Sequence, residues 1–323
     1  MNTKRKLCGI LIIAVIINAG ILAQTKNDAI DAFNKAVSIM KAEPVSAIES
    51  FEACIKISDQ VGDSAKDIRD KAVKVLPDLY YQKAYKIYSL DKKIQESLEV
   101  SKKGVKVAEK YNNSSSKEKF QKLIVQSYVG MGASYLKSNE NEKALSEFDS
   151  ALTISPNNTK IMLNKASTYQ KMGNTAKFAE TIDLCIEKSK ADGDTAQAKK
   201  ASNQALGYFR NAGAKANVAN KLTDAIALLN SSFKYGTDKD VYYHLADVYN
   251  KQKNFSEAEL NAQKGIEKDS ASAPEAKARF YYQLAVAQSG KGETEDACSS
   301  FKKALYGQFL EPSKAQMTNL KCK

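Results

Sequence analysis

The chain has 323 residues, 43% of them hydrophobic and 27% charged, and a formal net charge of +12. This composition is typical of a folded protein, and a single histidine, His244, excludes catalytic or metal sites built from several histidines. One hydrophobic core of about 300 residues would be unusually large, so the length favours several units that each pack on their neighbours.

The first 23 residues are predicted to be a targeting segment. Lys4, Arg5 and Lys6 precede an apolar run from Gly9 to Ala23, which is short for a membrane-spanning helix. The pattern resembles a secretory signal peptide that is removed after Ala23, with an uncleaved anchor as the alternative. Without the three basic residues the formal net charge falls from +12 to +9. We therefore expect an exported protein, in the periplasm or associated with the outer membrane.

A helical pattern with a period of 34 residues is clearest between positions 125 and 158. Aromatic, apolar and small residues occupy positions 4, 7, 8, 11, 20, 24, 27 and 32 of this repeat: Tyr128, Met131, Gly132, Tyr135, Ala144, Phe148, Ala151 and Pro156. We expect two antiparallel helices to cross at Gly132 and Ala144, because small side chains there let the backbones approach. A bulky residue at either position would overpack the crossing.

This order of residues resembles the tetratricopeptide repeat, in which helix pairs stack in tandem. Copies are predicted to start near residues 28, 78, 125, 159, 206, 239 and 278. Phe178 stands where one copy should have a small residue, so we expect a local distortion there. The resemblance implies an all-α fold, a right-handed α-solenoid of about seven helix-turn-helix repeats over residues 24–311 with a capping helix over residues 312–323.

The spacing between copies is irregular, and three polar–apolar periodic segments account for it. We expect residues 63–76, 115–124 and 193–205 to extend the first helix of the following copy, because long loops inside such an array are improbable. Pro77 lies between an extension and its repeat and predicts a kink. The other prolines after residue 23 fall at predicted turns or helix entries: Pro44, Pro156, Pro274 and Pro312.

Four cysteines follow the targeting segment. Cys54 and Cys185 both occupy repeat position 27, which is normally small and buried, so we predict core residues. Cys298 falls in the first turn of the last repeat's second helix, and Cys322 ends the capping helix. The runs from each cysteine to the connecting turn measure roughly 13 and 15 Å as helix, which brings both sulfurs to one end of an antiparallel pair. We predict a Cys298–Cys322 disulfide, as expected in an oxidising compartment.

Patterns typical of catalysis are missing from the sequence. It contains no Gly-rich phosphate loop, Cys-x-x-Cys pair, His-Glu-x-x-His helix or Gly-x-Ser-x-Gly turn. Carboxylate pairs such as Glu140 and Glu142 are predicted on exposed surfaces, whereas a catalytic carboxylate needs a pKa shifted by burial in a cleft. We therefore expect a protein that is not an enzyme and that uses no cofactor or metal.

In the tetratricopeptide repeat family, first helices line a concave groove that usually accepts a peptide or a partner helix. The family's groove positions imply a partner-binding site at Lys160, Asn164, Lys171, Arg210, Asn211, Asn217, Tyr243, Asp247, Asn250 and Tyr282. Amide and basic groups can hydrogen-bond an extended backbone or a carboxylate, and tyrosines offer flat contact area. The same polar residues would also suit a solvated helix surface.

One subtype of the family is disfavoured. Members that clamp the acidic C-terminus of cytosolic chaperones use a set of Lys and Asn residues over three successive copies. Asn164 matches that set alone, with Val129 and Ala133 where Lys and Asn should precede it.

The leading functional prediction is an exported, non-enzymatic scaffold that binds a protein or peptide partner in the bacterial envelope. The alternative is a surface-associating module whose lysine-rich outer face, densest between Lys83 and Lys122, contacts anionic lipid or glycan. An inert spacer is a third reading. Nucleic acid is not expected as a partner, because Arg is scarce and no recognition motif is present.

Overall fold

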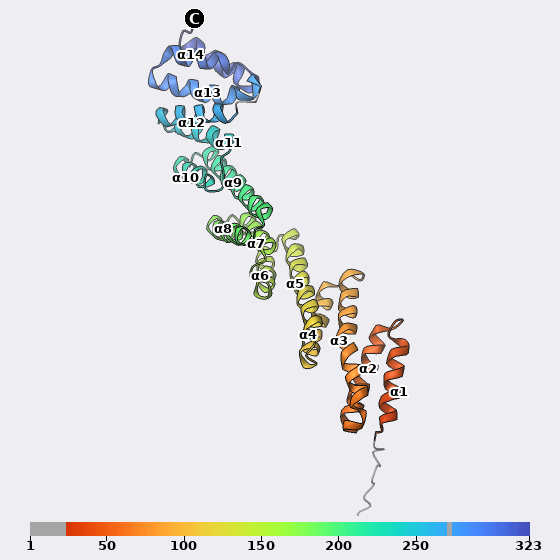
Figure 1. The fold of residues 1–323 in the computed structure, drawn as a ribbon. Coiled ribbons are helices and arrows are strands. Elements are labelled where there is room, and N and C mark those ends of the chain that lie inside the picture. The colour runs from red at the N-terminus through yellow and green to blue at the C-terminus, as the bar shows by residue number, and fades with distance from the viewer. Residues whose placement is uncertain (1–23, 270–272) are drawn as a thin grey trace, which may run out of the picture. The chain divides into compact units, whose positions relative to one another are not determined.

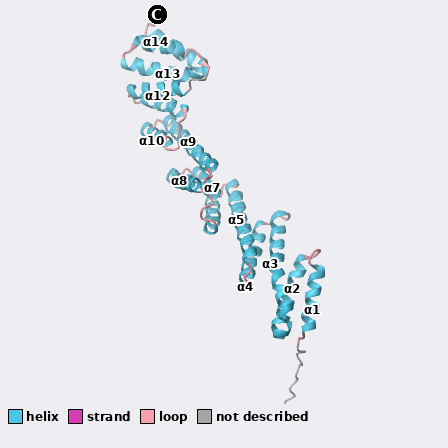
Figure 2. Cartoon of the chain, in the orientation of Figure 1, coloured by secondary structure: helices cyan, strands magenta, loops and turns pink. Residues whose placement is uncertain are grey.

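The computed structural model describes residues 24–269 and 273–323. The predicted targeting segment lies outside these residues. Within them the chain forms fifteen α-helices and two 3-10 helices and no strand (Figures 1 and 2), so the prediction of an all-α fold is confirmed. In the same residues no helix has the length and apolar character needed to cross a membrane.

Fourteen of the α-helices form seven helix-turn-helix pairs. The pairs are α1 (Lys26–Ile39) with α2 (Pro44–Val61), α3 (Lys66–Ser89) with α4 (Ile94–Lys110), α5 (Ser114–Lys137) with α6 (Asn141–Ile154), α7 (Thr159–Lys171) with α8 (Thr175–Ala191), α9 (Thr195–Val218) with α10 (Leu222–Ser232), α11 (Lys239–Lys251) with α12 (Phe255–Lys268), and α13 (Pro274–Lys291) with α14 (Thr294–Lys303). Each of the seven predicted starting residues falls in the first helix of a pair.

Three shorter elements complete the described chain. The 3-10 helix η1 (Gly62–Ala65) precedes α3, while η2 (Gly307–Phe309) and α15 (Leu310–Asn319) follow the last pair. The final helix thus begins at Leu310, earlier than the predicted boundary at residue 312. Pro312 is tolerated because it lies in the first turn, where no backbone N–H is needed for an intrahelical bond.

Internal contacts divide the chain into two units, Met1–Ser127 and Tyr128–Lys323, with the boundary inside α5. In the first unit, α1 to α4 pack in chain order and α1 also contacts α3. In the second unit each helix from α6 onward contacts the next one along the chain. The first helices α7, α9, α11 and α13 also contact one another in sequence. An α-solenoid is built in this way, with each pair buried by its neighbours.

The irregular repeat spacing comes from three long first helices. α3, α5 and α9 each have 24 residues, and their N-terminal parts are the segments that the sequence assigned to helical extensions. Pro77 is buried inside α3, which continues through it as one helix. The expected kink therefore does not interrupt the helix.

The helix crossings lie at the predicted small residues. A Cβ atom added to Gly132 would lie 2.6 Å from the ring of Phe148, and one added to Gly213 would lie 2.6 Å from Leu229 and 3.1 Å from the carbonyl oxygen of Ala225. Such distances are far below van der Waals contact. At Gly132 the Phe148 ring, and at Gly213 the Leu229 side chain and the backbone of α10, therefore occupy the space that a side chain would need.

Phe178 does not interrupt its helix, although the sequence predicted a local distortion there. It is fully buried in α8, which is unbroken from Thr175 to Ala191. Its ring packs on Tyr208 and Phe209 of α9, with centroids 4.3 and 6.0 Å away. The large side chain at this crossing thus fills space against the next pair.

The two predicted core cysteines, Cys54 and Cys185, are buried. Their thiols lie 3.4 and 3.2 Å from the carbonyl oxygens of Ala29 and Thr159, so each bridges to the first helix of its own pair. Burial raises the pKa of both thiols and keeps them protonated and unreactive.

The last helix, α15, is held mainly at its C-terminal end. Its only fully buried residue is Ser313, while Met317 and Leu320 pack half-buried on Phe301 and its neighbours in α13 and α14. The sulfur atoms of Cys298 and Cys322 lie at bonding distance, with Cα atoms 5.6 Å apart. The geometry that the disulfide prediction requires is therefore present.

Substituting two glycines of α9 by alanine should have opposite effects. Gly213→Ala forces a methyl group against Leu229 and should destabilise the fold by about 1–3 kcal/mol. Gly207→Ala meets no atom within 4 Å and should stabilise it by about 0.5–1 kcal/mol through the helix preference of alanine. Urea denaturation followed by circular dichroism measures both changes. Equal effects of the two substitutions would contradict the close crossing.

The folded protein should contain the Cys298–Cys322 disulfide. Thiol titration of the denatured, unreduced chain should then detect Cys54 and Cys185, and Cys8 where residues 1–23 are retained, with two further thiols only after reduction. Cys298→Ser should lower stability by about 3 kcal/mol, because the loop closed by the bond spans 24 residues. Detection of all thiols before reduction would rule out the bond.

Candidate partner-binding face

The four first helices α7, α9, α11 and α13 of the second unit share one side on which polar side chains join neighbouring helices. We call this side the first-helix face. Between α7 and α9 the joining residue is Gln204, whose Nε2 donates to Ser167 Oγ at 2.9 Å and to Gln170 Oε1 at 3.0 Å. Between α9, α11 and α13, ion pairs and amide hydrogen bonds join the helices.

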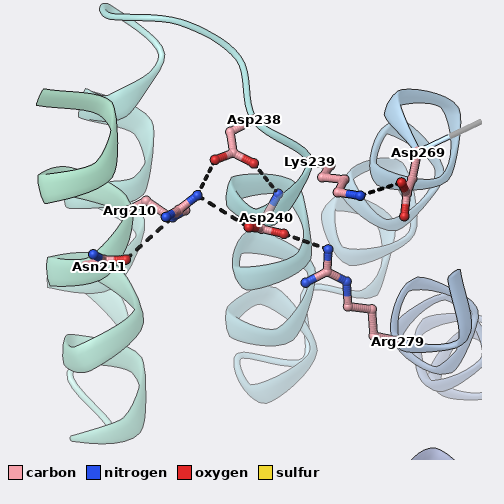
Figure 3. Close-up of polar contacts among 7 residues, drawn as sticks. All are labelled: Arg210, Asn211, Asp238, Lys239, Asp240, Asp269 and Arg279. Carbon is pink, nitrogen blue, oxygen red and sulfur yellow. Dashed lines mark hydrogen bonds and ion pairs between the residues drawn. The ribbon is translucent and has the colours of Figure 1, made fainter. Parts of the chain in front are cut away.

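A chain of ion pairs links α9, α11 and α13 (Figure 3). Arg210 of α9 pairs with Asp238 at the start of α11 and lies 3.3 Å from Asp240. Arg279 of α13 binds the other oxygen of Asp240 at 2.6 Å. The Asp240 carboxylate, 32% exposed, therefore lies between two guanidinium groups from flanking helices. Partial shielding from water makes such a pair stronger than one on an open surface.

Two turns further along α11, Asp247 repeats the role of Asp240. It accepts a hydrogen bond from Asn217 of α9 at 2.6 Å and another from Gln283 of α13 at 3.2 Å. Lys251 lies 2.9 Å from the same carboxylate. Asn250 adds two bonds to Gln283, at 2.8 Å to its side-chain oxygen and 2.9 Å to its carbonyl oxygen. The two layers hold three first helices in register.

Tyr243 and His244 lie on α11 between these two layers. The Arg279 guanidinium lies 5.3 Å from the centroid of the Tyr243 ring, and burial raises the pKa of Tyr243. Burial lowers the pKa of His244 against the opposing effect of Asp240 and Asp247. The structure places His244 half-buried.

Six of the ten predicted groove residues are used inside the protein. Arg210, Asn217, Asp247 and Asn250 belong to the two layers, and Tyr243 packs under Arg279. Tyr282 packs on Phe301 of α14 and Phe309 of η2, with centroids 5.8 and 5.3 Å away, so the chain itself covers much of this ring. Their polar groups are therefore not freely available to a partner.

The remaining predicted residues lie at the α7 and α9 end of the face. Lys160, Lys171 and Asn211 are exposed and Asn164 is half-buried. Lys171 Nζ donates to the carbonyl oxygen of Leu136 at 2.6 Å, and Asn211 accepts a long bond from Arg210 at 3.5 Å. Lys160, Lys171 and Asn211 are therefore open to solvent, and Asn164 is so in part.

Two residues of the face were missed by the family's numbered positions. Gln204 lies in the N-terminal extension of α9, and Asp238 lies one residue before α11. The signal for Gln204 was its spacing, because residues 204, 207 and 210 fall on successive turns of one side of the helix. Asp238 is the N-cap of α11, and nothing else in the sequence pattern predicted that it lies on this face.

The lysine-rich stretch from Lys83 to Lys122 is partly neutralised. Six of its eleven lysines lie within 4.0 Å of a carboxylate: Lys93 with Glu96, Lys102 with Glu99, Lys103 with Glu52, Lys117 with Glu109, Lys119 with Asp78 and Lys122 with Glu118. These pairs reduce the field that an anionic surface would meet.

The first unit contains a cleft of about 480 Å³ between α2 and α4, lined in part by Glu52, Asp59 and Tyr111. Its carboxylates are engaged, since Glu52 accepts the Tyr80 hydroxyl at 2.6 Å and Asp59 accepts Arg69. Among the described residues no three His, Cys, Asp or Glu side chains come together as metal ligands.

Tandem helix pairs that bury small residues at each crossing define a helical repeat protein. A family model for the tetratricopeptide repeat matches residues 125–158 and 278–306. These two stretches are therefore tetratricopeptide repeats, as the residue pattern predicted.

Comparison with curated protein sequences gives no match. Similar solved structures include the MamA protein, at 20% identity over 62% of this chain and 96% of the other, with a TM-score of 0.34. A tetratricopeptide repeat protein from Parabacteroides merdae ATCC 43184 has 16% identity over 91% and 98%, with a TM-score of 0.28. The P58(IPK) TPR domain has 12% identity over 92% and 100%, with a TM-score of 0.32. At these values the similarities carry no argument about function.

The stability of the fold should fall at mildly acidic pH because of His244. Burial holds the pKa of this histidine below its ordinary value of 6.5 in the folded protein. The unfolded chain therefore binds a proton at about pH 6.5 that the folded protein resists, and stability decreases as the pH falls below that value. His244→Gln removes this dependence.

Unfolding free energies of both proteins at about pH 8 and about pH 5.5 test this prediction. Relative to His244→Gln, the natural protein should lose stability on acidification. Because the chain has only one histidine, the comparison isolates this residue. A difference that does not change with pH would contradict the assignment.

Proposed function

We propose that the protein is an exported, non-enzymatic scaffold of the bacterial envelope that binds a protein partner on the first-helix face. The observation that carries this proposal is the chain of direct contacts from Ser167 through Gln204, Arg210 and Asp240 to Arg279. These contacts fix four helices in register, and a preorganised surface loses little conformational entropy when a partner binds.

The geometry favours the α7 and α9 end of the face as the place of contact. The α11 and α13 end is occupied by its own ion pairs and amide bonds, whereas the α7 and α9 end keeps Lys160, Asn164 and Asn211 open. Gly207 lies between Gln204 and Arg210 on the same side of α9, and a Cβ atom there would meet nothing within 4 Å. No side chain therefore covers the helix surface at this position.

Two features support export. Basic residues followed by a short apolar run open the chain, and the Cys298–Cys322 pair has the geometry of a disulfide. Disulfides persist in oxidising compartments such as the periplasm and are rare in the cytosol. The lysine-rich stretch remains the alternative contact surface, on anionic lipid or glycan, although more than half of its lysines already pair with carboxylates.

Site-specific photo-crosslinking in the native cells tests this function. A photoreactive residue at Asn164 or Asn211 should give a discrete crosslinked product in the envelope fraction. The same residue at Lys190 of α8 or Lys264 of α12, both exposed on second helices, should give none. Gly207→Trp should abolish the product by covering this side of α9, and circular dichroism verifies that the variant is folded, as expected where an added Cβ atom meets nothing within 4 Å.

Several outcomes would remove the proposal. Crosslinks of equal yield from the first-helix and second-helix positions would show that the face has no special role. A product that survives Gly207→Trp would place the contact elsewhere, and a product found only in the cytosolic fraction would contradict export.

A further inference from the structure

A cleft of about 300 Å³ lies between the second helices α10 and α12 of the second unit. Both helices pack on α11, but they do not pack closely on each other. The first helix α11 therefore forms the floor of the cleft. We call it the α10–α12 cleft, and its lining residues are Asn230, Phe233, Tyr242, Leu245, Tyr249, Glu257, Asn261 and Lys264.

The cleft uses a different side of α11 from the first-helix face. Tyr242, Leu245 and Tyr249 follow positions i, i+3 and i+7, which lie along one side of an α-helix. Asp240 and Asp247 of the first-helix face belong to a row that is shifted by two residues, about 200° around the helix. None of the predicted groove residues lines the cleft. The cleft is therefore a separate candidate site.

Three aromatic side chains line this cleft. Tyr242 and Tyr249 are two turns apart on α11, and their Cα atoms are roughly 10 Å apart along the helix axis. Phe233, at the end of α10, packs on Tyr242 with ring centroids 5.3 Å apart. All three side chains are half-buried. The protein thus supports the rings on one side and leaves apolar ring area open to the cleft.

Polar groups that the protein leaves unused surround these rings. Glu257 and Lys264 are exposed and make no ion pair with a described residue. Asn261 is 6% exposed, and its Nδ2 donates to the carbonyl oxygen of Glu257 at 2.8 Å. Its Oδ1 accepts no hydrogen bond from any described residue. Because an acceptor without a partner is costly to bury, a ligand that donates to this oxygen is favoured.

The Tyr249 side chain lies close to two of the polar groups. Burial raises the pKa of Tyr249, the charge of Glu257 raises it further, and a hydrogen bond with Asn230 acts in the opposite direction. The phenol therefore stays protonated, and it can donate as well as accept. Phenol, carboxylate and amide groups together suit a ligand whose own groups both donate and accept hydrogen bonds.

We propose that the α10–α12 cleft binds a neutral saccharide, with a sugar ring stacked on Tyr249 and its hydroxyl groups bonded to Glu257 and Asn261. This inference goes beyond the proposed function and does not rest on it. A sugar ring has an apolar face of C–H groups and a rim of hydroxyl groups, so it matches an aromatic floor with polar walls. The cleft volume of about 300 Å³ is at the lower end for small-molecule sites and suits one or two sugar rings.

Other classes of ligand match the lining less well. A metal ion needs several oxygen ligands with negative charge, and among the described lining residues only Glu257 is acidic. An anionic ligand would meet the carboxylate of Glu257, and an apolar ligand would leave the amide of Asn261 without a partner. A neutral molecule rich in hydroxyl groups satisfies both side chains.

Saturation-transfer difference NMR on the folded protein tests the inference. The probes are the methyl glycosides of glucose, galactose, mannose and N-acetylglucosamine, together with cellobiose and maltose. At least one of them should receive saturation on its ring C–H protons, with a dissociation constant in about the millimolar range, as expected for so small a ligand. Its affinity should change less than about twofold between about 50 and about 300 mM NaCl, because a neutral ligand is not screened by salt. Absence of transfer to all of these probes would overturn the proposal.

Two substitutions locate the bound sugar. Tyr249→Leu removes the stacking surface and Glu257→Ala removes a hydrogen-bond acceptor, so each should weaken binding at least about fivefold. The matched controls are Tyr135→Leu, at the same repeat position of another helix pair, and Glu267→Ala, exposed further along α12. Both controls should leave affinity within about twofold, and circular dichroism verifies that all four variants are folded. Equal losses in the cleft variants and the controls would contradict the assignment.

A competing probe and the crosslinking variants complete the test. Adenosine also carries a flat ring and hydroxyl groups, and if it displaces the saccharide and binds more tightly, the site is one for nucleosides and the proposal is wrong. Tyr249→Leu should leave the cellular crosslink from Asn164 unchanged, and Gly207→Trp should leave saccharide binding unchanged. Loss of both activities in either variant would contradict the separation of the cleft from the first-helix face.

Discussion

The close approach of paired helices is the constraint on which the second unit depends. At Gly132 and Gly213 the neighbouring helix lies where a side chain would otherwise stand. Only at this separation can each pair bury its apolar residues against the next pair. The stacking then brings first helices beside first helices, although they are some thirty residues apart in the sequence. The partner-binding face is thus a consequence of packing on the other side of the same helices.

Polar contacts then divide that face into two parts with different properties. Around Asp240 and Asp247, carboxylates of α11 satisfy basic and amide groups of α9 and α13. These bonds stabilise the stack and leave little capacity for an outside group. α7 and α9 contain no Asp or Glu, and their exposed residues Lys160 and Lys200 make no ion pair with any described residue. The α11 and α13 part of the face therefore stabilises the stack, and the α7 and α9 part is the proposed place of contact with a partner.

Much of the fold could be predicted from the sequence because the signals were local. Small residues at positions 8 and 20 predicted the crossings at Gly132 and Gly213, and helical periodicity predicted the long α9. Which groove residues bond within the protein could not be predicted, because this depends on side chains of different helices. Arg210 and Asp240 look equally suited to a partner or to each other. Phe309 covers Tyr282 because η2 passes over it, and the repeat pattern does not predict the path of η2.

The link between Cys298 and Cys322 also bears on how the second unit loses order. In a linear array the terminal elements open most readily, since they have one neighbour instead of two. α15 buries few residues of its own, and without a covalent tie it would be the natural starting point for such fraying. With the tie in place, α15 stays attached to α14, so opening at this end must involve the last helix pair as well. A single bond near the carboxyl end thus couples the unfolding of α15 to that of α14.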